Sequence, residues 1–283
     1  MQDVKIEKAE KLGLCFGVRR AVKLLKEAVR EHGEIETLGP VAHNRQLVET
    51  LAGLGVRSIE RVDQAQGKAL AITTHGTTPS VLGEIRAHDI EIIDTTCPIV
   101  RKAQNAAREL ADAGFDVIIF GQADHSEVKG LLGCTGDKGV AALSLRQMAD
   151  WEKTPSRLGI ISQTTQTRSA FTDFASQLVR MVGPKAREIR IVNTLCQVTQ
   201  AQQQAAMSLA SRSQIMIVIG GKYSANARHL VETCAPLVET HLVETADEID
   251  SSWLSGKHHV GVTAGASTPD EVVDELIARL ESL

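Results

Sequence analysis

Apolar residues recur along this chain in two periods that alternate from end to end. Three segments carry them at helical spacing, namely residues 16–32, 98–113 and 197–213. Each is followed by a run of aliphatic and β-branched residues, at 35–38, 115–120 and 215–219. The last two runs are continuously apolar, which is typical of strands covered on both faces. The pattern therefore predicts three helix–strand units in succession.

A further strand closes each predicted unit. These strands cover residues 69–75, 158–162 and 259–263, and each runs into a loop rich in hydroxyl side chains suited to capping another helix. Strand–helix alternation with short connections predicts parallel, doubly wound α/β units, whose ligand groups collect beyond the carboxyl ends of the strands. We expect three similar α/β domains, at residues 1–95, 96–194 and 195–283.

Each unit has a cysteine at the start of its first helix: Cys15, Cys97 and Cys196. The residue that follows each cysteine by 28 positions is, in chain order, His43, His125 and Ser224. A helix N-terminus stabilises a thiolate, the form that binds metal. No close cysteine pair of the zinc-site kind is present, so three distant thiolates suit a [4Fe–4S] cluster with one iron left open. Three half-buried cysteines that share no ligand are the alternative.

Two further cysteines, Cys134 and Cys234, lie outside the repeat near the ends of second helices, where we expect them to pack in the core. An odd total of five is not typical of a secreted disulfide framework. The net charge of −4 excludes a global basic field for nucleic acid. No apolar run approaches the roughly 20 residues that cross a bilayer, and the first residues lack a signal-peptide core. We expect a cytoplasmic protein with neither nucleic-acid nor membrane partner.

Polar side chains follow the predicted strands at matched positions. They are His43, His75, His125, Thr164, Ser224, Asn226 and Ser267. These side chains, together with N–H groups at helix starts, predict a site for a small phosphorylated ligand. Glu127 follows His125 by two residues and is the candidate proton donor of an enclosed site. The alternatives are turn or cap histidines and a solvated helix-start glutamate.

The motifs around these residues resemble the 4-hydroxy-3-methylbut-2-enyl diphosphate reductase family (LytB/IspH) over essentially the whole chain. The matching segments are 13–18, 41–45, 74–76, 94–98, 125–128, 162–165, 193–196, 224–226 and 263–269. The resemblance implies an α/β fold of three similar domains in pseudo-threefold arrangement around a central iron–sulfur cluster cleft. It also implies reductive removal of an allylic hydroxyl, the last step of the methylerythritol phosphate route, with two electrons and two protons.

The resemblance further assigns roles to residues. The cluster ligands are Cys15, Cys97 and Cys196, and the open iron binds the substrate hydroxyl as a Lewis acid. The diphosphate is bound by His43, His75, Ser224, Asn226 and Ser267, with His125 adding to that ring. Glu127 delivers protons with Thr164 as relay, and a ferredoxin or flavodoxin supplies electrons.

The chain departs from the family pattern at two places. Ala225 stands where a second serine is frequent, so one hydroxyl donor to the diphosphate is lost while the backbone N–H remains. Leu14-Cys15-Phe16-Gly17 replaces the frequent Phe-Cys-Ala-Gly, a packing variation. Two other classes of protein are alternatives. A non-catalytic iron–sulfur redox sensor has no need of Glu127 and Thr164. A sugar- or nucleotide-binding α/β protein lacks support, because no G-x-G-x-x-G follows the first strand.

Overall fold

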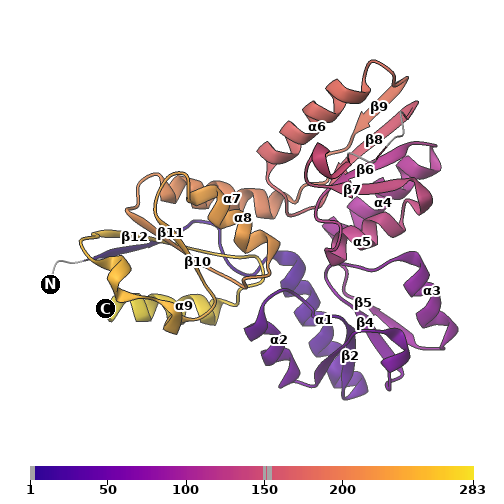
Figure 1. Ribbon diagram of the computed structural model, residues 1–283. Helices are drawn as coiled ribbons and strands as arrows, with labels where there is room; N and C mark the ends of the chain where they lie inside the picture. Colours follow the sequence, from indigo (N-terminus) through magenta and orange to yellow (C-terminus); the bar gives the residue numbers. More distant parts are fainter. Residues whose placement is uncertain (1–3, 149–150, 152–154) are drawn as a thin grey trace. The chain divides into compact units, whose positions relative to one another are not determined.

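The computed structural model describes residues 4–148, 151 and 155–283, and the strands of this part form three four-stranded parallel sheets (Figure 1). The first sheet has the order β3-β2-β4-β5, with bounds Val56–Ile59, Ile35–Leu38, Ala69–Ile72 and Glu91–Asp94. The second has the order β7-β6-β8-β9, with bounds Gly139–Ala142, Asp116–Phe120, Arg157–Ser162 and Glu188–Ile191. The third has the order β11-β10-β12-β1, with bounds Thr240–Val243, Ile215–Ile219, His259–Ala264 and Lys5–Lys8. The predicted α/β class is confirmed.

The three sheets share one strand order, but the third is completed from the other end of the chain. In the first two sheets the outer strands β5 and β9 follow their neighbours β4 and β8 in sequence. In the third, β1 takes that place and pairs in parallel with β12, with Lys5 opposite His259. The first strand of the chain is therefore part of the last sheet, a pairing that the sequence did not predict.

The longer helices of the described chain fall into three sets of three, according to what precedes them in the sequence. The helices that follow the cysteines are α1 (Phe16–His32), α4 (Pro98–Asp112) and α7 (Gln197–Ala210). Those that follow the central strands are α2 (Arg45–Ala52), α5 (Ser126–Gly133) and α8 (Ala225–Cys234). Those that follow the third strands are α3 (Pro79–Ala87), α6 (Arg168–Val182) and α9 (Asp270–Glu281). The three cysteine-headed helices were predicted to within a few residues.

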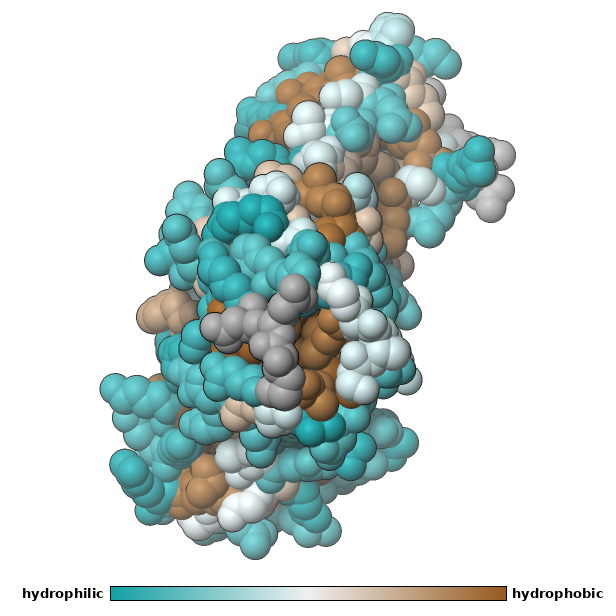
Figure 2. Space-filling model, turned by 90° about the vertical axis from the view of Figure 1, so that its left-hand side faces the viewer, coloured by the Kyte–Doolittle hydropathy of each residue, from teal (hydrophilic) through white to brown (hydrophobic). Residues whose placement is uncertain are grey.

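Helices cover both faces of the second and third sheets, as Figure 1 shows for α7 and α8 on one side of β10 and β12 and α9 on the other. Met216 and Val218 pack toward α7 and α8, whereas Ile217 packs toward α9. The face drawn in Figure 2 is mostly hydrophilic, with hydrophobic residues showing in separate areas. Cys134 and Cys234 are buried in two of these cores, which confirms their packing role.

The described chain divides into two compact units. One comprises residues 1–19, 42–53 and 197–283 and holds the third sheet, and the other comprises residues 20–41 and 54–196 and holds the first two. The division into three domains at 95/96 and 194/195 stays a prediction. None of the helices in the described part is long and apolar enough to cross a membrane.

Candidate active site

Each repeated cysteine lies between the outer strand of one sheet and the helix that follows that strand. Its N–H donates to a carbonyl two residues beyond the end of the neighbouring strand. The donor–acceptor pairs are Cys15 to Ala266 at 2.9 Å, Cys97 to Thr74 at 3.0 Å and Cys196 to Thr164 at 2.8 Å. The three cysteines are thus held at equivalent points beyond the carboxyl ends of β12, β4 and β8.

A second contact fixes the residue two positions before each cysteine. The N–H groups of Gly13 and Thr95 donate to the carbonyls of Ala264 and Ile72, both at 3.1 Å. Before Cys196, the hydroxyl of Thr194 donates to the carbonyl of Ser162 at 2.5 Å and accepts from its N–H at 2.8 Å. All three contacts reach the last residue of a strand. Together with the cysteine N–H bond, each contact forms a two-point clamp on the segment before the cysteine. The sequence did not predict this clamp, although Thr95 and Thr194 both lie two residues before a repeated cysteine.

The pKa of the Cys97 thiol is raised above its usual value. Burial is the main cause, and the N–H groups of Ile99 and Val100 at the start of α4 act in the opposite direction. Cys196 and Glu127 raise this pKa further, so both lie close to Cys97. The helix N-terminus alone therefore does not favour the thiolate here. A bound cationic group would favour the thiolate, because its positive charge offsets the repulsion among Cys97, Cys196 and Glu127.

Glu127 is buried in the first turn of α5, with only 1% of its surface exposed. One carboxylate oxygen accepts from the Thr164 N–H at 2.6 Å, and the other accepts from the Thr164 hydroxyl at 3.0 Å. Burial raises the pKa of Glu127 to about 7, although both bonds from Thr164 lower it. The solvated-glutamate alternative is wrong, because the side chain is enclosed and holds a proton near neutral pH.

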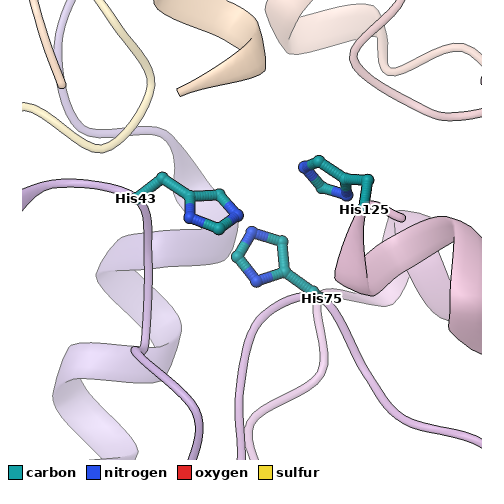
Figure 3. Close-up of side chains that lie close together, drawn as sticks. All are labelled: His43, His75 and His125. Atoms are coloured by element: carbon teal, nitrogen blue, oxygen red, sulfur yellow. The ribbon is translucent and has the colours of Figure 1, made fainter. Parts of the chain in front are cut away.

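His75 and His125 lie edge to face in the same unit, with ring centroids 5.4 Å apart (Figure 3). His125 is the N-cap of α5, and its Nδ1 accepts from the N–H of Glu127 at 3.2 Å. Since Nδ1 is an acceptor, the neutral ring carries its proton on Nε2. His125 is thus both a cap residue and a potential donor through Nε2.

The other unit holds the remaining candidate residues. Ser224 is the N-cap of α8 and accepts from the Ala227 N–H, and Ala225 is the first residue of that helix. The side chains of Ser224, Asn226 and Ser267 are all at least nine-tenths buried. Burial, together with the charge of Arg228, lowers the pKa of His43, which therefore is neutral at pH 7.

A family model described as LytB protein matches residues 6–281. The 4-hydroxy-3-methylbut-2-enyl diphosphate reductase of Dehalococcoides mccartyi (strain CBDB1) is 43% identical over 280 residues, which cover 99% of each chain. The enzyme of the same name from Geobacter metallireducens (strain ATCC 53774 / DSM 7210 / GS-15) is 39% identical over 276 residues, covering 97% of this chain and 96% of its own.

Two solved structures are similar to the chain. One is (E)-4-hydroxy-3-methyl-but-2-enyl diphosphate reductase, described as the terminal enzyme of the non-mevalonate pathway, with 35% identity, a TM-score of 0.71 and full coverage of both chains. The other is the E-1-hydroxy-2-methyl-but-2-enyl-4-diphosphate reductase from Plasmodium falciparum, with a TM-score of 0.88 and 22% identity, covering 98% of this chain and 87% of its own. At that identity the second likeness supports the fold alone.

Proposed function

This chain belongs to the LytB protein family, and from that premise we propose its function. It is a reductase that converts 4-hydroxy-3-methylbut-2-enyl diphosphate into isopentenyl and dimethylallyl diphosphates, the terminal step of the non-mevalonate pathway. Two electrons and two protons are consumed for each substrate. The allylic C–O bond breaks, one proton leaves with the hydroxyl as water, and the other ends on carbon.

Cys15, Cys97 and Cys196 are the proposed ligands of one [4Fe–4S] cluster. The donor set fits such a group, because all three cysteines occupy the same clamped position and Cys97 lies against Cys196 and backbone N–H groups. When bound, the cluster would pass on the two electrons that the reductant supplies and would offer an open Lewis-acidic iron to the hydroxyl oxygen. The five cysteines, all within the described part of the chain, form no disulfide with one another.

The observation that carries the proposal is the contact between Glu127 and Thr164. A buried carboxyl with a pKa of about 7 holds a transferable proton at neutral pH, and the Thr164 hydroxyl at 3.0 Å offers the proton a next position. The same Thr164 binds the N–H of Cys196 through its carbonyl, so the proton donor and a proposed cluster ligand share one support. A redox sensor without turnover has no use for this arrangement.

The diphosphate is the proposed ligand of the remaining candidates: His43, His75, His125, Ser224, Asn226 and Ser267. Ala225 contributes its backbone N–H at the start of α8 in place of a hydroxyl. The neutral His43 and the hydroxyl groups bind the anion as hydrogen-bond donors rather than by charge. The electron donor of the ferredoxin or flavodoxin class and the cytoplasmic location stay predictions.

The test is turnover of the holoenzyme prepared without oxygen. With substrate and a chemical reductant, the wild-type protein is expected to form both product diphosphates. Glu127→Gln is expected to lower kcat by about 100-fold or more, because a general acid is lost. Glutamine still accepts from the Thr164 N–H and donates to its hydroxyl, so fold, iron content and substrate affinity are expected to stay unchanged.

Two results would contradict the proposal in different ways. A colourless anaerobic protein whose thiols all react with an alkylating reagent contradicts the cluster. A protein that binds iron and sulfide but releases no product supports the sensor. Full activity of Glu127→Gln removes Glu127 from proton transfer while leaving the reductase itself in place.

A further inference from the structure

One buried glutamine joins the loop before Cys15 to Asn226. Gln202 lies in the second turn of α7, with 3% of its surface exposed. Its Nε2 donates to the carbonyl of Gly13 at 2.9 Å, and its Oε1 accepts from Nδ2 of Asn226 at 3.3 Å. All of these residues belong to the same compact unit.

These two bonds fix the orientation of both amides. The Gly13 carbonyl can only accept, so Gln202 must turn its NH₂ group toward it and its oxygen toward Asn226. Asn226 must then turn its NH₂ group toward Gln202. Its Oδ1 is buried and has no hydrogen-bond partner in the described structure, although the residue is only 4% exposed. A buried acceptor of this kind costs free energy unless an N–H group or a water donates to it. A diphosphate oxygen cannot donate, so the second hydrogen of the Asn226 NH₂ group is the donor left for an anion.

The Gly13 end of this chain of bonds is itself rigid. Gly13 has a φ of +73°, a conformation that side-chain-bearing residues rarely adopt, and its N–H binds the Ala264 carbonyl. Two residues later, the Cys15 N–H binds the Ala266 carbonyl, directly before Ser267. Gln202 therefore links Asn226 to the segment that contains Gly13 and Cys15. The N–H of Cys15 in turn links this segment to the loop after β12, which contains Ser267.

We propose that Gln202 is a positioning residue for the substrate: by accepting one N–H of the Asn226 amide, it holds the second N–H of Nδ2 available to the diphosphate. The inference rests on the proposed function, because it needs Asn226 to be a diphosphate ligand. Gln202 acts only through Asn226 and does not touch the substrate. Its loss weakens binding by releasing the Asn226 side chain to rotate, and it leaves the chemical step intact.

The test compares variants of the holoenzyme by calorimetric titration with inorganic diphosphate and by steady-state kinetics. Gln202→Met keeps the length of the side chain and removes both bonds. Its Kd for diphosphate and its KM are expected to rise about 10-fold, while kcat stays within about 2-fold, as for loss of one hydrogen bond to a charged group. Gln204→Met, an exposed position on the same helix, is the matched control and is expected to bind like the wild type.

A double-variant cycle tests whether the effect passes through Asn226. Asn226→Ala is expected to weaken diphosphate binding about 10-fold, and adding Gln202→Met is expected to weaken it no further. The inference would be overturned if Asn226→Ala and Gln202→Met raised the Kd for diphosphate independently, so that their effects multiplied in the double variant. It would also be overturned if Gln202→Met left this Kd unchanged.

The same measurements separate this inference from the function on which it rests. If Asn226→Ala binds as the wild type does, the proposed diphosphate role of Asn226 fails, and the role of Gln202 fails with it. If Asn226→Ala weakens binding and Gln202→Met does not, only the inference about Gln202 fails. Iron content and the melting temperature of each variant show that the cluster and fold are retained.

Discussion

At the scale of single residues, Thr164 places two functional groups at once. Its N–H and hydroxyl bind Glu127, and its carbonyl binds the N–H of Cys196. A shift of this one backbone unit would therefore move the proposed proton donor and a proposed cluster ligand together. Glu127 and Thr164 are 37 positions apart, so spacing alone does not bring them together, whereas the family resemblance already assigned both to one proton relay.

Glu127 also makes folding stability depend on pH. Burial raises its pKa from 4.5 in the unfolded chain to about 7 in the folded one. The contribution of this group to stability is complete below pH 4.5 and is lost as the pH rises through 7, a change of about 3 kcal/mol. We expect Glu127→Gln to gain stability relative to the wild type between pH 5 and pH 8, measured by thermal unfolding at both values.

Glu36 is the control with the opposite sign. Partial burial acts to raise its pKa, but the N–H groups of Gly67 and Gln66 and the charge of Arg57 lower it overall. Its contribution is present above pH 4.5 and is lost as the pH falls below that value. Glu36→Gln should therefore lose stability relative to the wild type at pH 7 and recover it in acid. Parallel pH profiles of the Glu127 variant and the wild type would contradict the raised pKa of Glu127.

At the scale of elements, central strands were predictable and outer strands were not. Ile215–Ile219 is apolar at every position because both of its faces are covered, and its pattern alone identifies a strand. Glu188–Ile191 and Lys5–Lys8 have four residues each, of which two and three are polar, since an outer strand buries less of its surface. Short runs of that kind are also common in loops, so periodicity cannot single them out.

The clamp before each cysteine gives a prediction at this scale. Thr194→Val removes a hydroxyl that both donates to the Ser162 carbonyl and accepts from its N–H. Thr95→Val removes only a donor, and the Thr95 N–H still binds the Ile72 carbonyl. We expect a loss of about 2 kcal/mol for Thr194→Val and about 1 kcal/mol for Thr95→Val.

The variants Thr194→Val and Thr95→Val are compared by two measurements. One is thermal unfolding of the apoproteins, and the other is the rate at which a chelator removes iron from the holoproteins. Thr194→Val is expected to show the larger fall in melting temperature and the faster loss of iron, because the segment before Cys196 loses both of its bonds to Ser162. Equal behaviour of the two variants would show that the Thr194 hydroxyl does not hold this segment.

At the scale of the whole molecule, the third sheet explains why the repeat is imperfect along the chain. In the first two sheets, α3 leads into β5 and α6 into β9, whereas nothing in the described chain follows α9 in this way. β1 fills the equivalent place, and its last residue, Lys8, forms an ion pair with Asp274 in the first half of α9 at 3.5 Å. β1 therefore begins at the end of the sheet where α9 finishes.

This arrangement predicts that the chain tolerates circular permutation. We expect a protein in which residue 283 is joined to residue 1, and which opens at the exposed turn between Pro184 and Lys185, to keep its three sheets. Its melting temperature is expected to stay within about 5 °C of the wild type. Removing residues 1–9 without a join is expected to lower it by about 10 °C or more, since Val4 and Ile6 pack in the third core.

The pairing of β1 with β12 also has a consequence for the order of events during synthesis. Lys5 and its partner His259 are 254 positions apart in the chain, and the ribosome adds about 5–20 residues per second. For on the order of ten seconds or more, the nascent chain carries an unpaired edge-forming segment while the first two sheets can already form. The third sheet closes only once β12 has been made, so its formation is the step most exposed to chaperones and to mispairing with another chain.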